Sequence, residues 1–316
     1  MEVITIDHPH HFKRNELPAV AMALGFFDGV HLGHQKVIQT AKDFAEQKGL
    51  QSAVMTFDPH PSVVLGRSEQ QIEYISPLPE KIDLISRLEI DYLYIVRFTK
   101  EFANLLPQEF VDNYIIGLHV DHAVAGFDFS YGRMGKGTME TITFHSRGRF
   151  TFTTVPELSE GSEKISSTLI RSRIRNGKTE DLPQLLGRYY QTAGIVIHGD
   201  KRGRTIGFPT ANVNIPEDWL IPPPGVYAVR VKVSGSWYYG VCNIGYKPTF
   251  NQEKAARPSV EVHIFEFSGD IYGEQLMIEW HLHIREEQKF SGIEELVAQI
   301  ERDKQKALAY FKKSYV

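Results

Sequence analysis

The sequence predicts two domains of different class: an α/β domain with a mainly parallel sheet, then a small antiparallel β-barrel or sandwich with a C-terminal helix. Three observations predict this. Apolar runs alternate with helical patterns in the first half, turn-separated strand-like runs fill the second, and 316 residues suffice for two ordinary domains. We place the first domain at residues 1–185 and the second at 186–316.

The first half alternates strands and helices. Strand-like apolar runs occupy residues 20–25, 53–57, 92–98 and 122–126, and helical periodicity occupies 34–49, 80–88 and 107–116. Gly49 follows the first helical pattern and is a typical residue to end it. A β-α-β-α order implies a mainly parallel sheet with helices on both faces and right-handed crossovers.

The pattern changes late in the first half and again after Tyr190. Residues 142–155 predict an antiparallel pair or edge strands, and short helices are expected at 166–175 and 181–186. In the second half, turn clusters such as the Pro-Pro-Pro-Gly run separate the strand candidates. These candidates are residues 193–198, 226–233, 237–244, 260–267 and 275–284, followed by an amphipathic helix at 293–311.

Composition excludes several classes of function. A net charge of −4 lacks the basic surplus that binding to nucleic acid or an anionic membrane needs, so local groups must hold any anionic substrate. The lone cysteine, Cys242, allows no disulfide within the chain and lies in an apolar stretch typical of a packing residue. No signal peptide or membrane-spanning run is evident, so we expect a cytoplasmic protein. His8, His10 and His11 lack a second ligand cluster and predict a solvated terminus rather than a metal site.

A glycine-rich segment lies between the first predicted strand and its helix, at residues 25–34 (GFFDGVHLGH). Its glycines let the backbone approach a ligand, and the following helix directs free N–H groups toward an anion. His31 and His34 add donors that can be cationic beside phosphates. The alternative is an ordinary glycine-containing turn with two surface histidines.

This segment resembles the His-x-Gly-His signature of nucleotidyltransferases, and its longer form is similar to the prokaryotic FAD synthetase branch. The resemblance implies a Rossmann-like nucleotidyltransferase domain that moves AMP from ATP onto FMN and releases pyrophosphate. Its implied catalytic residues are His31, His34 and Arg171. Its implied ATP contacts are Gly25, Phe27, Asp28, His31, His34, Asp128, Ser167, Thr168 and Arg171.

Two of these regions keep an alternative interpretation. Ser167 or Thr168 can cap the helix at 166–175 without binding phosphate. A further segment, residues 56–61 (TFDPHP), follows the second strand, and the resemblance implies that Phe57, His60 and Pro61 contact the flavin. Phe57 could belong to the core instead, and His60 could be a turn residue.

The second half opens with a basic, glycine-rich segment at residues 199–212 (GDKRGRTIGFPTAN). It suits phosphates but lacks the Gly-Lys-Ser/Thr ending of a Walker loop. Thr210 and Asn212 alternate along an extended segment, so both oxygens can face one side, where Mg²⁺ prefers such hard ligands. The alternative is a hairpin loop with incidental polar residues.

This string resembles the Gly-Phe-Pro-Thr-Ala-Asn signature of riboflavin kinases. The resemblance implies that Glu261 is the general base for the riboflavin 5′-hydroxyl, that Arg285 contacts the flavin, and that Thr210 and Asn212 hold Mg²⁺. Its implied ATP contacts are Gly199, Lys201, Arg204, Gly207, Thr210 and Asn212.

Both halves together resemble the prokaryotic bifunctional riboflavin kinase/FAD synthetase family. The expected substrates are ATP, riboflavin and FMN, with Mg²⁺ as cofactor, no nucleic acid or membrane partner, and self-association left open. Two rivals remain: a different adenylyl- or cytidylyltransferase, and a non-catalytic flavin sensor that keeps the fold for binding.

Overall fold

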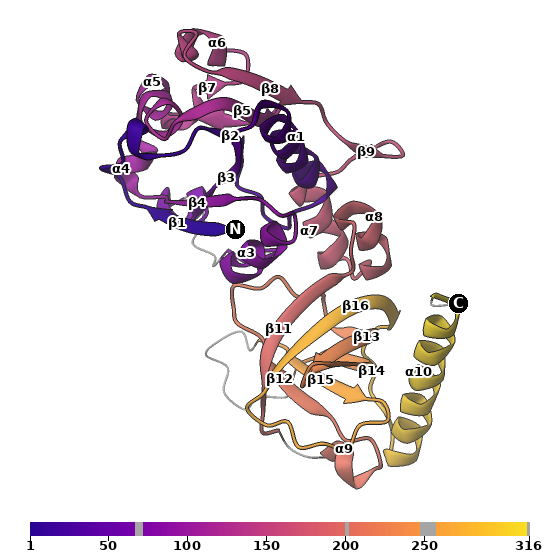
Figure 1. Ribbon diagram of the computed structural model, residues 1–316. Coiled ribbons are helices and arrows are strands. Elements are labelled where there is room, and N and C mark those ends of the chain that lie inside the picture. Colours follow the sequence, from indigo (N-terminus) through magenta and orange to yellow (C-terminus); the bar gives the residue numbers. More distant parts are fainter. Residues whose placement is uncertain (67–71, 200–201, 247–256, 315–316) are drawn as a thin grey trace. The chain divides into compact units, whose positions relative to one another are not determined.

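The computed structural model describes residues 1–66, 72–199, 202–246 and 257–314 (Figure 1). The chain forms two compact units, Met1–Ser167 and Thr168–Val316, which we describe separately. This boundary falls inside helix α7 (Ser167–Arg175). The division at residues 185 and 186 stays a prediction, because a boundary of contacts does not test which residues each activity needs.

The first unit is built on a six-stranded sheet in which every neighbouring pair is parallel, as predicted. The order across the sheet is β1-β4-β3-β2-β5-β8. Its strands are β1 (Glu2–Ile6), β2 (Val20–Leu24), β3 (Gln51–Asp58), β4 (Tyr92–Arg97), β5 (Val120–Gly126) and β8 (Thr151–Val155). All five side chains of β2 are buried, which is typical of a central strand covered on both faces.

Helices cover both faces of this sheet, also as predicted. One core contains Val37, Ile38 and Ala41 of α1, and the other contains Phe102, Phe110 and Tyr114. Helix α1 ends at Gly49, whose φ of 66° is left-handed and whose N–H bonds to the Ala45 carbonyl. The helices are α1 (Leu32–Lys48), α2 (Pro61–Val64), α3 (Leu78–Ser86), α4 (Lys100–Ala103), α5 (Pro107–Phe110), η2 (Val111–Ile116) and α6 (Ile142–Ser146). Shorter elements are η1 (Arg14–Glu16), β6 (Ser130–Tyr131), η3 (Arg133–Gly135), β7 (Gly137–Thr138), β9 (Ser159–Glu160) and β10 (Glu163–Lys164).

Two sequence expectations in this unit were only partly confirmed. Residues 142–146 form helix α6, whose buried Ile142 and Ser146 are one turn apart, while β8 is an edge strand, one of the two alternatives expected, and lies parallel to β5. The N-terminus is largely exposed, as expected, but it is ordered, because β1 adds to the sheet beside β4. His8 Nδ1 lies 3.1 Å from the Tyr114 hydroxyl, and His10 Nε2 lies 3.0 Å from the Asn113 carbonyl. Tertiary packing on the η2 segment therefore orders the histidine-rich terminus.

The second unit is a closed antiparallel barrel of six strands, ordered β11-β12-β15-β14-β13-β16. This confirms the predicted barrel and adds β12, which coincides with the end of the Gly-Phe-Pro-Thr-Ala-Asn string. Its strands are β11 (Tyr190–Ile197), β12 (Ala211–Asn214), β13 (Gly225–Val233), β14 (Ser236–Gly245), β15 (Ser259–Ile264) and β16 (Gln275–Arg285). Its helices are α7 (Ser167–Arg175), η4 (Thr179–Asp181), α8 (Leu182–Leu186), α9 (Arg202–Thr205) and α10 (Ile293–Ser314).

Helix α10 lies along the outside of the barrel (Figure 1). Its buried Ala307 and Phe311 pack with Val226, Ala228 and Val241. Trp280 fills the barrel, where it is fully buried and donates to the Thr192 hydroxyl. Cys242 is also buried, as expected for a packing residue, and its burial raises the pKa of the thiol.

Candidate active sites

The two signature histidines of the first unit stand at the N-terminus of α1. His31 is the N-cap residue, and its Nδ1 accepts the backbone N–H of His34 at 3.2 Å. The two rings stack with 3.5 Å between centroids. A Cβ on Gly33 would lie 3.1 Å from the His31 ring, so a larger residue would push this ring aside. In a neutral His31, accepting at Nδ1 places the ring proton on Nε2, which is then the donor of the ring.

The loop before α1 is held by backbone and side-chain hydrogen bonds. Asp28 is 3% exposed, and its carboxylate accepts the N–H groups of Ile75 at 3.3 Å and Ser76 at 3.1 Å. Ser76 Oγ accepts the Gly29 N–H at 2.7 Å, and Ser167 Oγ donates to the Asp28 carbonyl at 2.9 Å. These contacts give Asp28 and Ser167 a role in shaping the loop. Their predicted contacts with ATP stay predictions.

His34 is a half-buried polar group of this site, and its Nδ1 is buried. Burial lowers its pKa well below the ordinary value, and the nearby charges of His31 and Lys81 lower it further. The edge of the His34 ring meets Phe27, with 5.2 Å between centroids, and Phe27 is 2% exposed. Within the described residues, His34 Nδ1 is buried and has no hydrogen-bond partner. A neutral imidazole with an unused nitrogen fits a site that receives a polar ligand.

The other predicted ATP contacts of the first half lie in different places. Asp128 forms a 2.7 Å ion pair with Lys164, whose Nζ also sits 4.3 Å from the centre of the Phe127 ring. The sequence analysis did not identify Lys164 as a partner of Asp128. Lys164 lies on β10, 36 residues further along the chain, and only the fold of the β9–β10 hairpin brings it to Asp128. Thr168 and Arg171 are on α7 and fall in the second compact unit, whereas His31 and His34 belong to the first.

The segment predicted to contact the flavin divides into core and surface. Phe57 is 8% exposed and packs in the core against Phe102, 5.7 Å away between centroids. His60 caps α2 through its Nδ1, which accepts the Ser62 N–H at 3.1 Å, and Pro61 starts that helix. The rings of His60 and Phe26 are nearly perpendicular, with 4.5 Å between their centroids. Phe26 is half-buried whereas Phe27 is buried, a difference that the sequence did not predict.

The second unit brings three polar residues together across adjacent strands. Glu261 of β15 is directly opposite Asn212 of β12 on one side and Asn243 of β14 on the other. Directly opposite residues of antiparallel strands point to the same face of the sheet. The sequence did not mark Asn243 as a site residue, because only the strand register places it beside Glu261.

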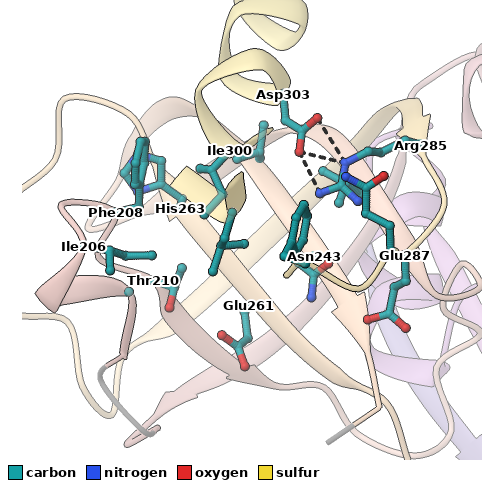
Figure 2. Close-up of a pocket in the computed structure, with 16 residues that line it drawn as sticks. Ile206, Phe208, Thr210, Asn243, Glu261, His263, Arg285, Glu287, Ile300 and Asp303 are labelled. Atoms are coloured by element: carbon teal, nitrogen blue, oxygen red, sulfur yellow. Dashed lines mark hydrogen bonds and ion pairs between the residues drawn. The ribbon is translucent and has the colours of Figure 1, made fainter. Parts of the chain in front are cut away.

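A cavity of about 310 Å³ opens beside these strands. Its polar lining includes Thr210, Asn243, Glu261, His263 and Arg285 (Figure 2). In Figure 2, the side chains of Thr210, Glu261 and Asn243 follow one edge of the cavity. A volume of this size is adequate for a small-molecule site.

The predicted phosphate loop contributes close backbone contacts. A Cβ on Gly199 would lie 2.2 Å from the Asn212 amide, and one on Gly203 would lie 2.2 Å from the Phe208 carbonyl. Gly207 has a left-handed φ of 85°. Arg204 is exposed on the short helix α9, and Lys201 lies outside the described residues. His263 holds the far end of the loop, since its Nδ1 donates to the Pro209 carbonyl at 2.8 Å.

Arg285 is held by a buried carboxylate of α10. Its Nε lies 2.9 Å from Asp303 Oδ2 and 3.2 Å from Oδ1, and its Nη2 lies 2.9 Å from Oδ2 (Figure 2). Asp303 is 2% exposed and also accepts from Gln299 at 2.8 Å. This fork-shaped pair aims Arg285 along the cavity and makes α10 part of the site.

Comparison with known families gives each unit a match. Residues 13–169 match the FAD synthetase family, and residues 186–311 match the riboflavin kinase family. A relative from Bacillus subtilis (strain 168) named bifunctional riboflavin kinase/FMN adenylyltransferase is 55% identical, covering 98% of each chain. One of the same name from Listeria monocytogenes is 54% identical over 99% of each chain. This chain belongs to the bifunctional riboflavin kinase/FMN adenylyltransferase family.

A solved structure of the same architecture accompanies this family assignment. A chain from Streptococcus pneumoniae described as a macrolide-efflux protein matches with a TM-score of 0.85 and 34% identity, covering 96% of this chain and 98% of that one. From this match we infer only a shared fold, because a shared fold alone does not specify an activity. In the part of the chain that the structure describes, no helix has both the length and the apolar character that crossing a bilayer requires.

Proposed function

We propose that the first unit of this enzyme transfers AMP from ATP to FMN and that the second unit transfers phosphate from ATP to riboflavin. One observation carries this proposal: each unit has its own polar site. The first unit has the stacked His31 and His34 at the N-terminus of α1, and the second has Glu261 between two asparagines. Transferase activity of this bifunctional kind follows from the family.

For adenylyl transfer, the chain supplies positioning and electrostatic stabilisation rather than a covalent step. The FMN phosphate attacks the α-phosphorus of ATP in line, and the α–β bridging oxygen leaves with pyrophosphate. The free N–H groups at the start of α1 and the donors of His31 and His34 face the accumulating negative charge. Phosphates also raise the pKa of His34, because an adjacent anion favours the cationic ring. Arg171, Thr168 and Asp128 are proposed ATP contacts.

For phosphoryl transfer, Glu261 accepts the proton of the riboflavin 5′-hydroxyl as that oxygen attacks the γ-phosphorus. The strand register holds Asn212 and Asn243 on either side of this carboxylate. Arg285, fixed by Asp303, is the proposed flavin contact at the other end of the cavity. The close approach of Gly199 to Asn212 brings the phosphate loop next to the base.

The metal of the kinase site is proposed to be Mg²⁺. Thr210 and Asn212 offer hydroxyl and amide oxygens, the donor type that this ion prefers alongside phosphate and water. No cluster of three or more His, Cys, Asp or Glu side chains suited to a metal is found among the described residues. Thr210 and Asn212 alone supply two oxygen ligands, which fits an ion that binds together with the nucleotide phosphates. There Mg²⁺ would neutralise phosphate charge. A cytoplasmic location and self-association remain predictions.

One experiment tests the assignment of two reactions to two sites. Riboflavin, Mg²⁺ and ATP are incubated with the enzyme, and the flavins are separated by chromatography. We expect FMN and then FAD from the wild type, FMN alone from His34→Ala, and no FMN from Glu261→Gln, which should still convert added FMN to FAD. Loss of both reactions in one of these folded variants would contradict the division, and no product from the wild type would favour a flavin sensor.

A further inference from the structure

Lys81 is a buried cation to which the sequence patterns assign no role. It is 2% exposed and shares the buried face of α3 with Leu84 and Ile85, at helical spacings of three and four. Lysine is rarely buried without a partner of opposite charge, because removing an ammonium group from water is costly. Its presence on this face therefore needs a physical reason.

The Lys81 ammonium lies beneath the glycine-rich loop that precedes His31. Its Nζ donates to the Phe26 carbonyl at 2.9 Å and to Thr56 Oγ1 at 3.4 Å, and it lies 4.0 Å from the centre of the Phe26 ring. Thr56 Oγ1 donates to the same Phe26 carbonyl at 2.8 Å. Lys81 thus joins the end of β3 to the loop that follows β2, at the edge of the sheet where the histidines stand.

The hydrogen-bond partners of Lys81 do not neutralise its charge. Both hydrogen-bond acceptors are uncharged, and across the described ranges no ion pair to Lys81 is present. Asp28 and Asp58 act on it electrostatically, while its own charge acts on His34. Asp28 already accepts two backbone N–H groups. A buried cation next to an anion-binding loop is complementary to a ligand that brings negative charge.

We propose that Lys81 is a positioning residue of the adenylyl-transfer site, which holds the loop through the Phe26 carbonyl and supplies buried positive charge that favours the ATP phosphates beside His34. This inference rests on the adenylyl transfer proposed above and extends it to a residue outside the signature motifs. Phe26 links the two roles, because its carbonyl and ring both contact the ammonium.

The protonation of Lys81 gives this role a measurable signature. Burial lowers its pKa to about 8, against the opposing influence of Asp28 and Asp58. His34, the titratable group facing it from α1, has a lowered pKa and stays neutral at that pH. The free enzyme therefore loses the ammonium charge as the pH rises through about 8, and kcat/KM for ATP in FAD formation should fall there.

Stability changes in the opposite direction. Between the lowered pKa of about 8 and the ordinary lysine pKa of 10.5, the unfolded chain binds the proton and the folded chain does not. The contribution of Lys81 to stability therefore rises with pH over this interval. An alkaline loss of FAD formation that arises from Lys81 cannot be attributed to unfolding caused by the same group.

The test compares Lys81→Met, Lys81→Arg and the control Lys42→Met in the full-length enzyme. Lys42 Nζ donates to the Leu88 carbonyl at 3.2 Å, so the control loses a similar hydrogen bond away from the loop. The kcat and KM for ATP are measured in FAD formation from FMN between about pH 6 and pH 10. FMN formation from riboflavin in the same preparations reports on folding of the second unit, and thermal unfolding followed by circular dichroism reports on folding of the first.

We expect Lys81→Met to lower kcat/KM for ATP by about 10-fold to 100-fold at neutral pH, mainly through KM, and to abolish the alkaline limb. Lys81→Arg should move that limb to higher pH, because guanidinium stays charged, and Lys42→Met should keep the wild-type profile.

An unchanged limb in either Lys81 variant, or equal losses of both reactions, overturns the proposal. If Lys81→Met does not fold, the Lys81→Arg profile decides alone. A wild type that forms FMN but no FAD would instead refute the adenylyl transfer on which the inference rests.

Discussion

His31 caps the helix that begins beside it, because its Nδ1 accepts the backbone N–H of His34 at 3.2 Å. The same imidazole therefore caps the N-terminus of α1 and belongs to the proposed adenylyl-transfer site. This double use links the stability of the helix to the chemistry of its N-terminus, and two substitutions separate them.

His31→Ala removes both the cap and the donor, whereas His31→Asn keeps a side chain that caps helices well. We expect His31→Ala to lose about 1 kcal/mol of stability and His31→Asn to lose less. Both should lower the rate of FAD formation by about 100-fold or more, because alanine has no donor and the shorter asparagine amide does not place its N–H where the imidazole Nε2–H lies. Thermal unfolding and flavin chromatography measure the two effects. Recovery of FAD formation in His31→Asn would show that capping is the main role of His31.

ATP binding at the first site should take up protons. Burial holds the pKa of His34 below its ordinary value in the free enzyme, and phosphate raises it. Between the two values the bound state carries the extra proton, so ATP affinity should increase as the pH falls. Calorimetry in buffers of different ionisation enthalpy measures this uptake. His34→Gln is the matched variant, and an uptake equal to that of the wild type would exclude His34 as its source.

Asn243 should influence the kinase through its position opposite Glu261. In Asn243→Asp a second carboxylate adjoins the base, and because like charges oppose ionisation, the pair should hold a proton to higher pH. We expect the acid limb of FMN formation to move upward by about 1 pH unit, with little change in FAD formation from FMN. Asn243→Ala is the control without added charge. A similar limb in both variants would argue against electrostatic coupling to Glu261.

Asp303→Asn should separate the structural and flavin-binding roles of α10. Removing the charge leaves Arg285 without its buried partner, which should cost about 3 kcal/mol of stability. We also expect KM for riboflavin to rise by about 10-fold, because the guanidinium is no longer aimed along the cavity. Denaturant unfolding and steady-state kinetics provide the measurements. Glu301→Gln, on the exposed side of α10, should change neither, and an unchanged KM in Asp303→Asn would mean that the pair only stabilises the barrel.

Sequence patterns were most informative where local rules and global packing agree. The β-α-β alternation predicted the parallel sheet, and Gly49 ended α1 through the left-handed conformation that glycine adopts readily. They failed where tertiary contacts overrode local composition. The histidine-rich N-terminus is largely exposed, as its composition predicted, but composition did not predict that β1 pairs with β4 or that His8 contacts Tyr114.

The sequence by itself determined the two domain classes, the two glycine-rich anion loops, and the residues His31, His34, Asn212 and Glu261 as candidates for chemistry. Only the tertiary structure decided which distant groups join them. Asn243 reaches Glu261 through strand register, Asp303 reaches Arg285 from α10, and Lys81 reaches the loop from α3. The sequence assigned none of the three a role in a site, because a polar residue in a helix or strand gives the same sequence pattern whether its side chain faces water or a site. Long-range packing alone sets that direction.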